Sequence, residues 1–273
     1  MTLGSHSIWV LAGAILLVVL AWALLRNADF ERGIVADIAQ VEQATAAGAV
    51  PLLPQIVADF ALRAGAVYGR TRPIHLEHRA TLTVDRVRSP IRIDAEQWLS
   101  PTRSAIAWVG RGGMFGLPVT VVDSFVGGTG RLEARVIGLI KVAGGSGPDF
   151  DKGELQRYLS ELPVHPDAIL NNDSLQWRQI DERTVHVTAQ SSTGAASATF
   201  TFDAAGDIVG MLASDRPMSV AGGTVPTRWR GSYSNYRTMG RYRIPTHGEV
   251  GWELPDGLFT YWRGDIVLYD GRR

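Results

Sequence analysis

The first strong pattern in the chain is an uninterrupted apolar segment near the N-terminus. Residues 8–25 read IWVLAGAILLVVLAWALL and contain no charged side chain. A helix of this length extends for about 27 Å, close to the thickness of the hydrocarbon layer of a bilayer. Trp9 and Trp22 lie near its two ends, where interfacial aromatic side chains are common. The pattern predicts a transmembrane helix over residues 8–25, with the lipid bilayer as its partner.

A cleaved signal peptide is the alternative for this segment. Ala21 and Ala23 have the spacing of a cleavage site, but they lie inside the apolar run, and no Lys or Arg precedes it. We therefore favour a retained, single-pass anchor. Arg26 and Arg32 follow the segment, and the positive-inside rule taken alone would leave the domain in the cytoplasm. Two charges are a weak bias, and long domains can be translocated regardless of such charges. Our expectation is an extracytoplasmic domain, with the cytoplasmic side left open.

Two helices are predicted after the apolar segment. Apolar residues recur at helical spacing over residues 28–47, and Gly48 suits the C-cap. Pro54 suits the first position of a second helix that ends near Arg63. The predicted organisation is an N-terminal segment over 1–27, a helical connector over 28–66 that packs on the domain, and a β-rich domain over 67–273.

From residue 74 onward the apolar period becomes two. His78 and Ala80 belong to a set of inward positions that alternate with polar ones between residues 74 and 84, which is typical of a half-buried strand. Glycine-rich stretches at 110–113 and 144–148 are predicted turns. Further strands are expected over 91–98, 104–109, 118–126, 130–142, 184–189, 198–203, 208–213, 228–236, 241–253, 258–263 and 265–270.

A helical insertion over residues 151–170 interrupts the strands. Asp151 and Glu154 have the spacing of a capping box, Tyr158 lies on the apolar face, and Pro163 ends the helix. The predicted fold class is α+β: an N-terminal transmembrane helix, then a mainly antiparallel curved sheet or half-barrel with a helical insertion.

Composition narrows the function classes. The chain has 273 residues, a formal net charge of zero and no cysteine. Zero net charge with scattered arginines argues against nucleic acid as a partner, because phosphate binding needs a basic face. The absence of cysteine excludes disulfides, thiolate metal sites and a cysteine nucleophile.

Candidate chemistry is sparse. His78 lies on the apolar side of its strand, where it is either a general base in a pocket or a satisfied core group. His75 is expected on the opposite face, so we predict no shared metal site, and no cofactor-binding motif is present.

Arg157 and Glu161 are four apart on the inserted helix, and we favour a surface ion pair over a place at the mouth of a cleft. For Asp215 and Arg216, at most one can face inward.

The tryptophans of the domain are expected either to line an apolar ligand pocket or to fill the core of the sheet. The candidate ligand-binding residues are His78, Trp108, Arg157, Tyr158, Glu161, Trp177, Asp215, Arg216, Trp229 and Trp252.

A family resemblance rests on two blocks of sequence that keep their order. These are Arg157–Glu161 with Pro166 and Trp177, and then Asp215–Pro217, Trp229–Gly231, Tyr236 and Gly240–Trp252. Together they resemble a bacterial family of unknown function that often carries an N-terminal membrane segment, and the resemblance covers about Pro51 to the C-terminus. The strand-rich pattern with a helical insertion is similar to the half-barrel of lipoprotein carriers such as LolA and LppX. That similarity implies a concave sheet covered by helices, with an apolar cavity for acyl chains.

The leading hypothesis is a membrane-tethered, non-enzymatic module that binds a lipid, acyl chain or lipoprotein in an apolar β cavity. An uncharacterised hydrolase that uses Glu161, Asp215 or His78 is the alternative from another class, and it requires two of these side chains within hydrogen-bond reach of each other. A scaffold for other membrane proteins is the third, and it would present an exposed apolar patch without an internal cavity.

Overall fold

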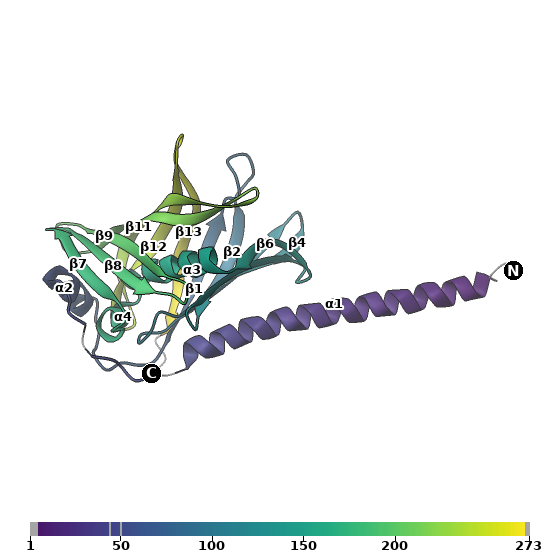
Figure 1. Ribbon diagram of the computed structural model, residues 1–273, viewed down its shortest axis with the longest axis horizontal. Helices are drawn as coiled ribbons and strands as arrows, with labels where there is room; N and C mark the ends of the chain where they lie inside the picture. The colour runs from purple at the N-terminus through teal and green to yellow at the C-terminus, as the bar shows by residue number, and fades with distance from the viewer. Residues whose placement is uncertain (1–4, 44, 50, 271–273) are drawn as a thin grey trace.

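The computed structural model describes residues 5–43, 45–49 and 51–270, with side chains from Ala14 onward. One long helix, α1 (Ser5–Glu42), projects from a β-rich body (Figure 1). The prediction of separate helices on either side of Arg26 is wrong, because residues 26–29 contain no proline or glycine that would end a helix. The side chains of residues 8–13, within the predicted span, lie outside the described ones. Within the part of the chain that the structure describes, no helical stretch combines the length and the hydropathy that a membrane span requires.

The sheet contains the thirteen strands of the described chain, all antiparallel to their neighbours. The first run is β1 (Ile74–Leu82), β2 (Ile91–Leu99), β3 (Ile106–Met114), β4 (Leu117–Val126), β5 (Thr129–Val136) and β6 (Ile140–Ser146). The second is β7 (Gln176–Asp181), β8 (Thr184–Gln190), β9 (Ala195–Phe202), β10 (Ile208–Val220), β11 (Gly223–Met239), β12 (Tyr242–Leu254) and β13 (Gly257–Asp270).

The first and last strands of the chain lie side by side in the middle of the sheet. The spatial order is β6-β5-β4-β3-β2-β1-β13-β12-β11-β10-β9-β8-β7, so β1 pairs with β13 and the edges are β6 and β7. The helical insertion crosses from one edge to the other as α3 (Pro148–Ser160), η1 (Leu162–Val164) and α4 (Pro166–Asn171). Consequently α3 contacts strands of both runs, β4, β5 and β6 on one side and β8, β9 and β10 on the other (Figure 1).

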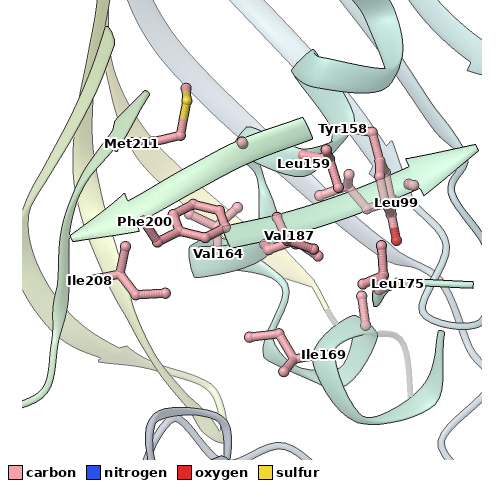
Figure 2. Close-up of a cluster of buried hydrophobic side chains, with 14 of the residues drawn as sticks. Leu99, Tyr158, Leu159, Val164, Ile169, Leu175, Val187, Phe200, Ile208 and Met211 are labelled. Atoms are coloured by element: carbon pink, nitrogen blue, oxygen red, sulfur yellow. The ribbon is translucent and has the colours of Figure 1, made fainter. Parts of the chain in front are cut away.

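The main core fills the space between the concave face of the sheet and the helices. Tyr158 and Leu159 of α3 pack against Val187 and Phe200 of the sheet (Figure 2). Helix α2 (Gln55–Arg63), which matches the predicted second helix, adds Phe60 to this core. Residues buried this completely exclude water from the part of the concave face that lies under the helices. The fold is therefore an α+β half-barrel with a curved, mainly antiparallel sheet, as the sequence predicted.

Helix α1 covers the opposite, convex face of β2, β3 and β4. Its residues Phe30, Ile34 and Val41 pack in a second apolar cluster with Trp98 and Val109. Val109 is on the convex face because it is one residue away from the inward-facing Trp108. The helix is thus joined to the domain by its C-terminal half, while its N-terminal half extends beyond the sheet (Figure 1).

Two predicted turns are strands instead. Gly110 and Gly112 lie within β3, where a side chain at Gly112 would collide with the carbonyl oxygen of Arg92 on the neighbouring strand. The stretch from Gly144 lies largely within β6, where a side chain at Gly145 would meet the ring of Phe150. Glycine is needed at these positions because neighbouring atoms approach the strand closely. From sequence alone, a glycine required by close packing cannot be distinguished from a glycine required by a turn.

Strand boundaries differ elsewhere as well: β7 has no predicted counterpart, and the strands expected over 258–263 and 265–270 form the single strand β13. The predicted strand over 130–142 is divided into β5 and β6 by a turn at Ile137 and Gly138, both with positive φ. The inserted helix begins at Pro148 after the N-cap residue Gly147, so Asp151 is not its cap. The Asp151 carboxylate instead accepts a hydrogen bond of 2.7 Å from the Gly130 N–H and ties the helix to β5.

Candidate functional site

A small pocket lies on the concave face where the C-terminal end of α3 meets strands β1, β11, β12 and β13. Its volume is about 40 Å³. This is the volume open to the centre of a water-sized sphere, and one water molecule needs roughly 10–15 Å³ of it. The pocket therefore holds about three water molecules and is too small for an acyl chain. Its lining includes His78, Arg157, Ser160, Glu161, Val164, Tyr233, Val250, Trp262, Gly264 and Ile266.

Arg157 is the central side chain of this site. Its Nε lies 2.9 Å from Oε1 of Glu161, and its Nη2 donates a hydrogen bond of 3.2 Å to Oε1 of Gln97 on β2. Both members of the ion pair are largely buried. The expectation of a surface pair is therefore wrong, because the face of α3 that carries Arg157 packs against the sheet. The structure instead places the pair at the pocket.

Two tryptophans flank the Arg157 guanidinium. Its Cζ lies 5.8 Å from the ring of Trp108 on β3 and 5.8 Å from the ring of Trp262 on β13. Each indole lies over a glycine two residues further along its strand, Gly110 and Gly264, where a Cβ atom would collide with the ring. The glycines let the indoles lie flat on the sheet. A desolvated cation between aromatic faces gains about 2 kcal/mol or more.

A second buried pair adjoins the first. Nη2 of Arg216 lies 3.5 Å from Oε1 of Glu154, its Nη1 donates to the carbonyl oxygen of Gly153, and its Cζ lies 4.3 Å from the Trp229 ring. Burial, followed by the nearby Asp123 carboxylate, raises the pKa of Glu154 to about 8. Glu154 is therefore mostly protonated at neutral pH.

We call the charged and polar groups between α3 and the sheet the inner polar cluster. It consists of His78, Gln97, Asp123, Glu154, Arg157, Glu161 and Arg216. Burial of the His78 ring, with Arg157 as the second cause, lowers the pKa of His78 to about 3, so the imidazole is neutral at physiological pH. A neutral imidazole offers one donor and one acceptor to the pocket.

Several buried polar atoms around Arg157 have no hydrogen-bond partner among the described residues. They are Nδ1 and Nε2 of His78, Nε2 of Gln97, Nε1 of Trp108, Oδ1 of Asp123, Oε2 of Glu154 and Nε1 of Trp262. Buried polar atoms are nearly always paired in folded proteins, and each unpaired one costs roughly 1–3 kcal/mol. Their concentration beside Arg157 marks a place where water molecules or the polar group of a ligand could be bound.

Some of the predicted site residues lie elsewhere. Tyr158 points into the main core, where its hydroxyl accepts a hydrogen bond of 2.9 Å from Asn172. Trp177 stacks on Phe200, also away from the pocket. Asp215 is partly exposed and pairs with Lys152 at 2.5 Å. Arg216 is the inward residue of the two, because the register of β10 shifts between Ala213 and Arg216 and interrupts the simple alternation.

The remaining predicted tryptophans, Trp229 and Trp252, lie on β11 and β12 next to the inner polar cluster. Trp252 stacks on Tyr261 with 5.9 Å between ring centroids. The Nε1–H of Trp229 donates a hydrogen bond of 3.2 Å to the Tyr261 hydroxyl. Of the predicted residues, the structure thus brings together His78, Trp108, Arg157, Glu161, Arg216 and Trp229, with Trp252 one contact further away.

The catalytic arrangement that a hydrolase would need is not seen in the described ranges. No hydrogen bond or ion pair there joins any two of Glu161, Asp215 and His78; His78 and Glu161 share the pocket only as lining residues. His75 faces away from His78, and its ring lies 4.8 Å from the Trp98 ring, in a tilted arrangement, on the convex side. No group of three or more metal-ligating side chains was found among the described residues.

Sequence reasoning missed Gln97, Asp123 and Glu154. Gln97 and Asp123 are polar residues on the inward faces of β2 and β4, which are otherwise apolar, and that signal is visible in the alternation. Glu154 was interpreted as half of a capping box, whereas it is buried against Arg216. His165 lies in the connection between η1 and α4 and is buried.

Comparisons with known structures give distant similarities. The chain is similar to a putative outer membrane lipoprotein-sorting protein domain from Vibrio parahaemolyticus, with 9% identity over 80% of this chain and 92% of the other, at a TM-score of 0.42. It is also similar to a LolA superfamily protein from Nitrosomonas europaea, with 9% identity over 80% and 94% of the two chains, at a TM-score of 0.38.

A DUF1329 family protein from Desulfovibrio piger shows a similar relationship, with 10% identity over 79% of this chain and 90% of the other, at a TM-score of 0.39. No curated protein matches the sequence.

One family model covers most of the chain. It matches residues 42–264, which include the two blocks of sequence that carried the resemblance and nearly all of the sheet. The chain therefore belongs to the DUF6544 family, a family of unknown function.

Proposed function

We propose that this protein is a membrane-tethered binding module that holds the polar head of a lipid against the inner polar cluster. The observation that carries the proposal is the set of buried, unpaired polar atoms around Arg157. Gln97, Trp108 and Trp262 each have an unpaired N–H, and the neutral His78 adds a fourth donor. A donor-rich site suits an acceptor-rich group such as a carboxylate or a phosphate.

The surroundings of these donors favour an amphipathic ligand over a wholly polar one. Trp108 belongs to an apolar cluster on the concave face with Ala80, Ile93 and Ala95, and Trp262 packs against it. Leu82, Ile91 and Val121 extend this cluster and are only partly buried. Because the pocket holds only a few water molecules, a hydrocarbon tail would lie along these side chains rather than inside the pocket.

The membrane tether is the second part of the proposal. Residues 14–25 of α1 are apolar, and large side chains such as Leu16, Val18 and Leu24 are more than half exposed. A run of exposed aliphatic side chains on a projecting helix is unfavourable in water and is stabilised by lipid. We place the domain on the extracytoplasmic side; a compartment-sensitive reporter fused to the C-terminus tests this placement.

The ligand proposal is tested with the full-length protein in detergent. Lipids that copurify are identified by mass spectrometry of a solvent extract, and binding of a fluorescent fatty acid and of phosphatidylglycerol is titrated. We expect Arg157→Met to weaken binding at least about tenfold, because it removes a charge-assisted hydrogen bond to the head. Trp262→Phe keeps the apolar ring but removes one donor, and it should weaken binding by a smaller factor.

Arg228→Met is the matched control, because Arg228 also pairs with a carboxylate, Glu253 at 2.8 Å, but on an exposed part of the sheet. Its affinity should equal that of the wild type. The proposal fails if neither ligand binds the wild type and no lipid copurifies. It also fails if Arg157→Met binds as well as Arg228→Met does.

A further inference from the structure

The turns of two neighbouring hairpins form an exposed apolar surface at one end of the sheet. The β3–β4 and β5–β6 turns lie side by side, since the Ile137 N–H donates a hydrogen bond of 2.8 Å to the Pro118 carbonyl oxygen. Phe115 is 84% exposed, the highest value among the aromatic side chains of the described domain. We call this surface the tip patch; it consists of Phe115, Leu117, Ile137, Ile140 and Val142.

The backbone at the tip patch is strained in a way that keeps apolar side chains exposed. Phe115 has φ 54° and Ile137 has φ 49°, both in the left-handed region that normally requires glycine or asparagine. They are two of only three non-glycine residues with positive φ in the described chain. This conformation costs roughly 1–2 kcal/mol for each residue, and a turn selected only for stability would place glycine there.

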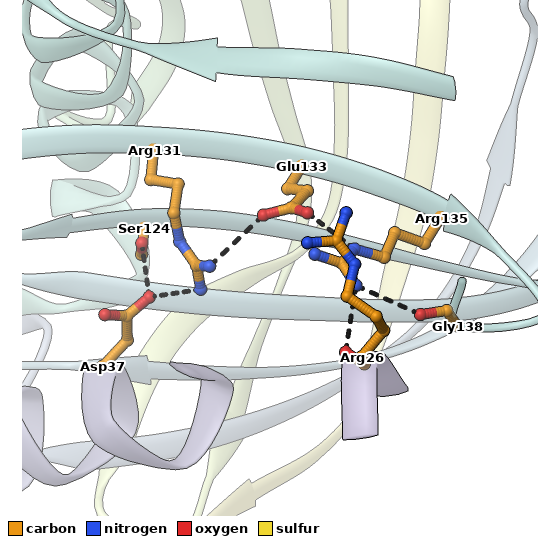
Figure 3. Close-up of polar contacts among 7 residues, drawn as sticks. All are labelled: Arg26, Asp37, Ser124, Arg131, Glu133, Arg135 and Gly138. Carbon is orange, nitrogen blue, oxygen red and sulfur yellow. Dashed lines mark hydrogen bonds and ion pairs between the residues drawn. The ribbon is translucent and has the colours of Figure 1, made fainter. Parts of the chain in front are cut away.

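The tip patch adjoins the point where α1 leaves the domain. Arg135, near the end of β5, donates hydrogen bonds of 3.3 Å both to the Arg26 carbonyl oxygen of α1 and to the Gly138 carbonyl oxygen of the turn (Figure 3). Glu133 holds Arg135 at 2.6 Å and lies 3.4 Å from Arg131 (Figure 3). These contacts connect the exit of the helix to the β5–β6 turn.

A further ion pair holds the adjoining part of the helix. Arg131 also pairs with Asp37 of α1 at 2.8 Å, and Ser124 donates to the same carboxylate at 2.8 Å (Figure 3). The exposed apolar run of α1 ends at Leu25, directly before Arg26, whose carbonyl oxygen accepts the hydrogen bond from Arg135. The tip patch therefore begins where the apolar part of the helix ends.

We infer that the tip patch contacts the same lipid bilayer as α1, as a second membrane interface of the domain. The inference rests on the proposed tether, because a bilayer around residues 14–25 meets the two turns next. Lys141 is exposed between Ile140 and Val142, where its ammonium would reach anionic headgroups while the aliphatic side chains enter the interface. The contact would hold the domain at a defined position on the membrane.

The natural absence of cysteine allows a direct test in the full-length protein. Single-cysteine variants Phe115→Cys and Ile140→Cys are labelled with an environment-sensitive fluorophore and reconstituted into vesicles of phosphatidylcholine and phosphatidylglycerol. Ile180→Cys, at a similarly exposed isoleucine on the opposite edge strand β7, is the matched control. Leu20→Cys reports the anchor. Quenching by spin-labelled lipid and by aqueous iodide is measured for each.

We expect lipid-borne quenching at Phe115 and Ile140, with iodide quenching reduced at least about twofold relative to Ile180, because interfacial side chains lie below the headgroups. If Leu20 is quenched by lipid but the two tip positions match Ile180, the tip inference is overturned and the tether stands. If Leu20 is not quenched by lipid, the tether itself fails. Tip positions protected from both quenchers would assign the patch to a protein contact and would also overturn the inference.

Discussion

At the scale of single residues, the inner polar cluster is the most unusual part of this protein. Arg157 and Arg216 are buried opposite Glu161 and Glu154, and each guanidinium also lies over indole rings. The Arg157–Glu161 ion pair contributes little net stability, because the desolvation of both charges offsets their attraction. Glu154 is mostly protonated at neutral pH, so Arg216 is a buried cation opposite a neutral carboxyl group. The unpaired polar atoms around these groups add a further cost to the fold unless water or a ligand group satisfies them.

Glu154 allows a residue-scale prediction about pH. Its pKa of about 8 in the folded protein exceeds its ordinary value of 4.5. Between these values the folded chain keeps a proton that the unfolded chain has lost, so this group lowers the free energy of unfolding as pH rises. The slope is about 1.4 kcal/mol per pH unit. Below pH 4.5 both states are protonated and the effect disappears.

Glu154→Gln removes this titration. Relative to the wild type, we expect the variant to gain stability steadily as pH is raised through this window, as measured by urea unfolding in detergent. Glu182→Gln, on an exposed turn, controls for the loss of one carboxylate. Parallel stability curves for the wild type and Glu154→Gln would mean that Glu154 does not hold a proton in the folded state.

At the scale of elements, two glycines at the contact between the inserted helix and the sheet differ in how much space surrounds them. A side chain at Gly130 on β5 would collide with the backbone of Phe150 and Asp151 in α3, whereas one at Gly153 in α3 would meet no atom within 4 Å. We expect Gly130→Ala to lower the free energy of unfolding by about 1–3 kcal/mol, because the helix must move off the sheet. Gly153→Ala should raise it by about 0.4–1 kcal/mol.

Thermal unfolding of the two variants in parallel measures this difference. Each serves as the control for the other, since both replace glycine with alanine. Equal effects at the two positions would show that the close approach of α3 to β5 is not required.

Helix α1 offers a second test at this scale, because adjacent residues have opposite environments. Ile34 is 3% exposed against the convex face, and Val35 is 64% exposed. We expect Ile34→Ala to destabilise the attachment of the helix by about 2–5 kcal/mol, and Val35→Ala by less than about 0.5 kcal/mol. Limited proteolysis near Gln43 and hydrogen exchange of β2–β4 report the attachment. Similar protection in the two variants would contradict the packing of α1 on the sheet.

At the scale of the whole molecule, the sheet is closed in its middle by the first and last strands. Leu82 at the end of β1 pairs with Trp262 in β13, so the central contact joins residues far apart in sequence. The two strand runs also meet across the concave side, where the Ser192 N–H donates a hydrogen bond of 2.8 Å to the Gly128 carbonyl oxygen. Folding therefore depends on contacts that no local segment can form alone.

Removal of the last strand tests this arrangement. A chain that stops before Gly257 leaves β1 and β12 with unpaired edges in the middle of the sheet, and exposed edges of this kind promote aggregation. We expect the truncated protein to be insoluble, as judged by the soluble fraction after expression and by far-ultraviolet circular dichroism of any soluble material. A soluble truncated chain with native circular dichroism would contradict the central position of β13.

Part of the candidate site was predictable and part was not. The alternation of strand positions, which decides the face of each side chain, identified His78 as an inward residue. It also limited Asp215 and Arg216 to one inward member at most, without deciding which, and Trp108 was a candidate only as one of the tryptophans of the domain. Gln97, Asp123 and Glu154 were missed, although an inward polar residue in an apolar strand is a usable signal. The burial of Arg157 and Glu161 could not be foreseen, because it depends on which side of α3 lies against the sheet.

By itself the sequence determined the curved antiparallel sheet, the helical insertion and the apolar stretch of α1. These features follow from side-chain periodicity and turn residues, which act within a few positions along the chain. Only the tertiary structure decided that β1 pairs with β13, that Gly110 and Gly264 lie beneath tryptophan rings, and that one buried cluster collects charges from α3 and distant strands. Those outcomes depend on packing between segments far apart in sequence, and local pattern carries no information about which segments meet.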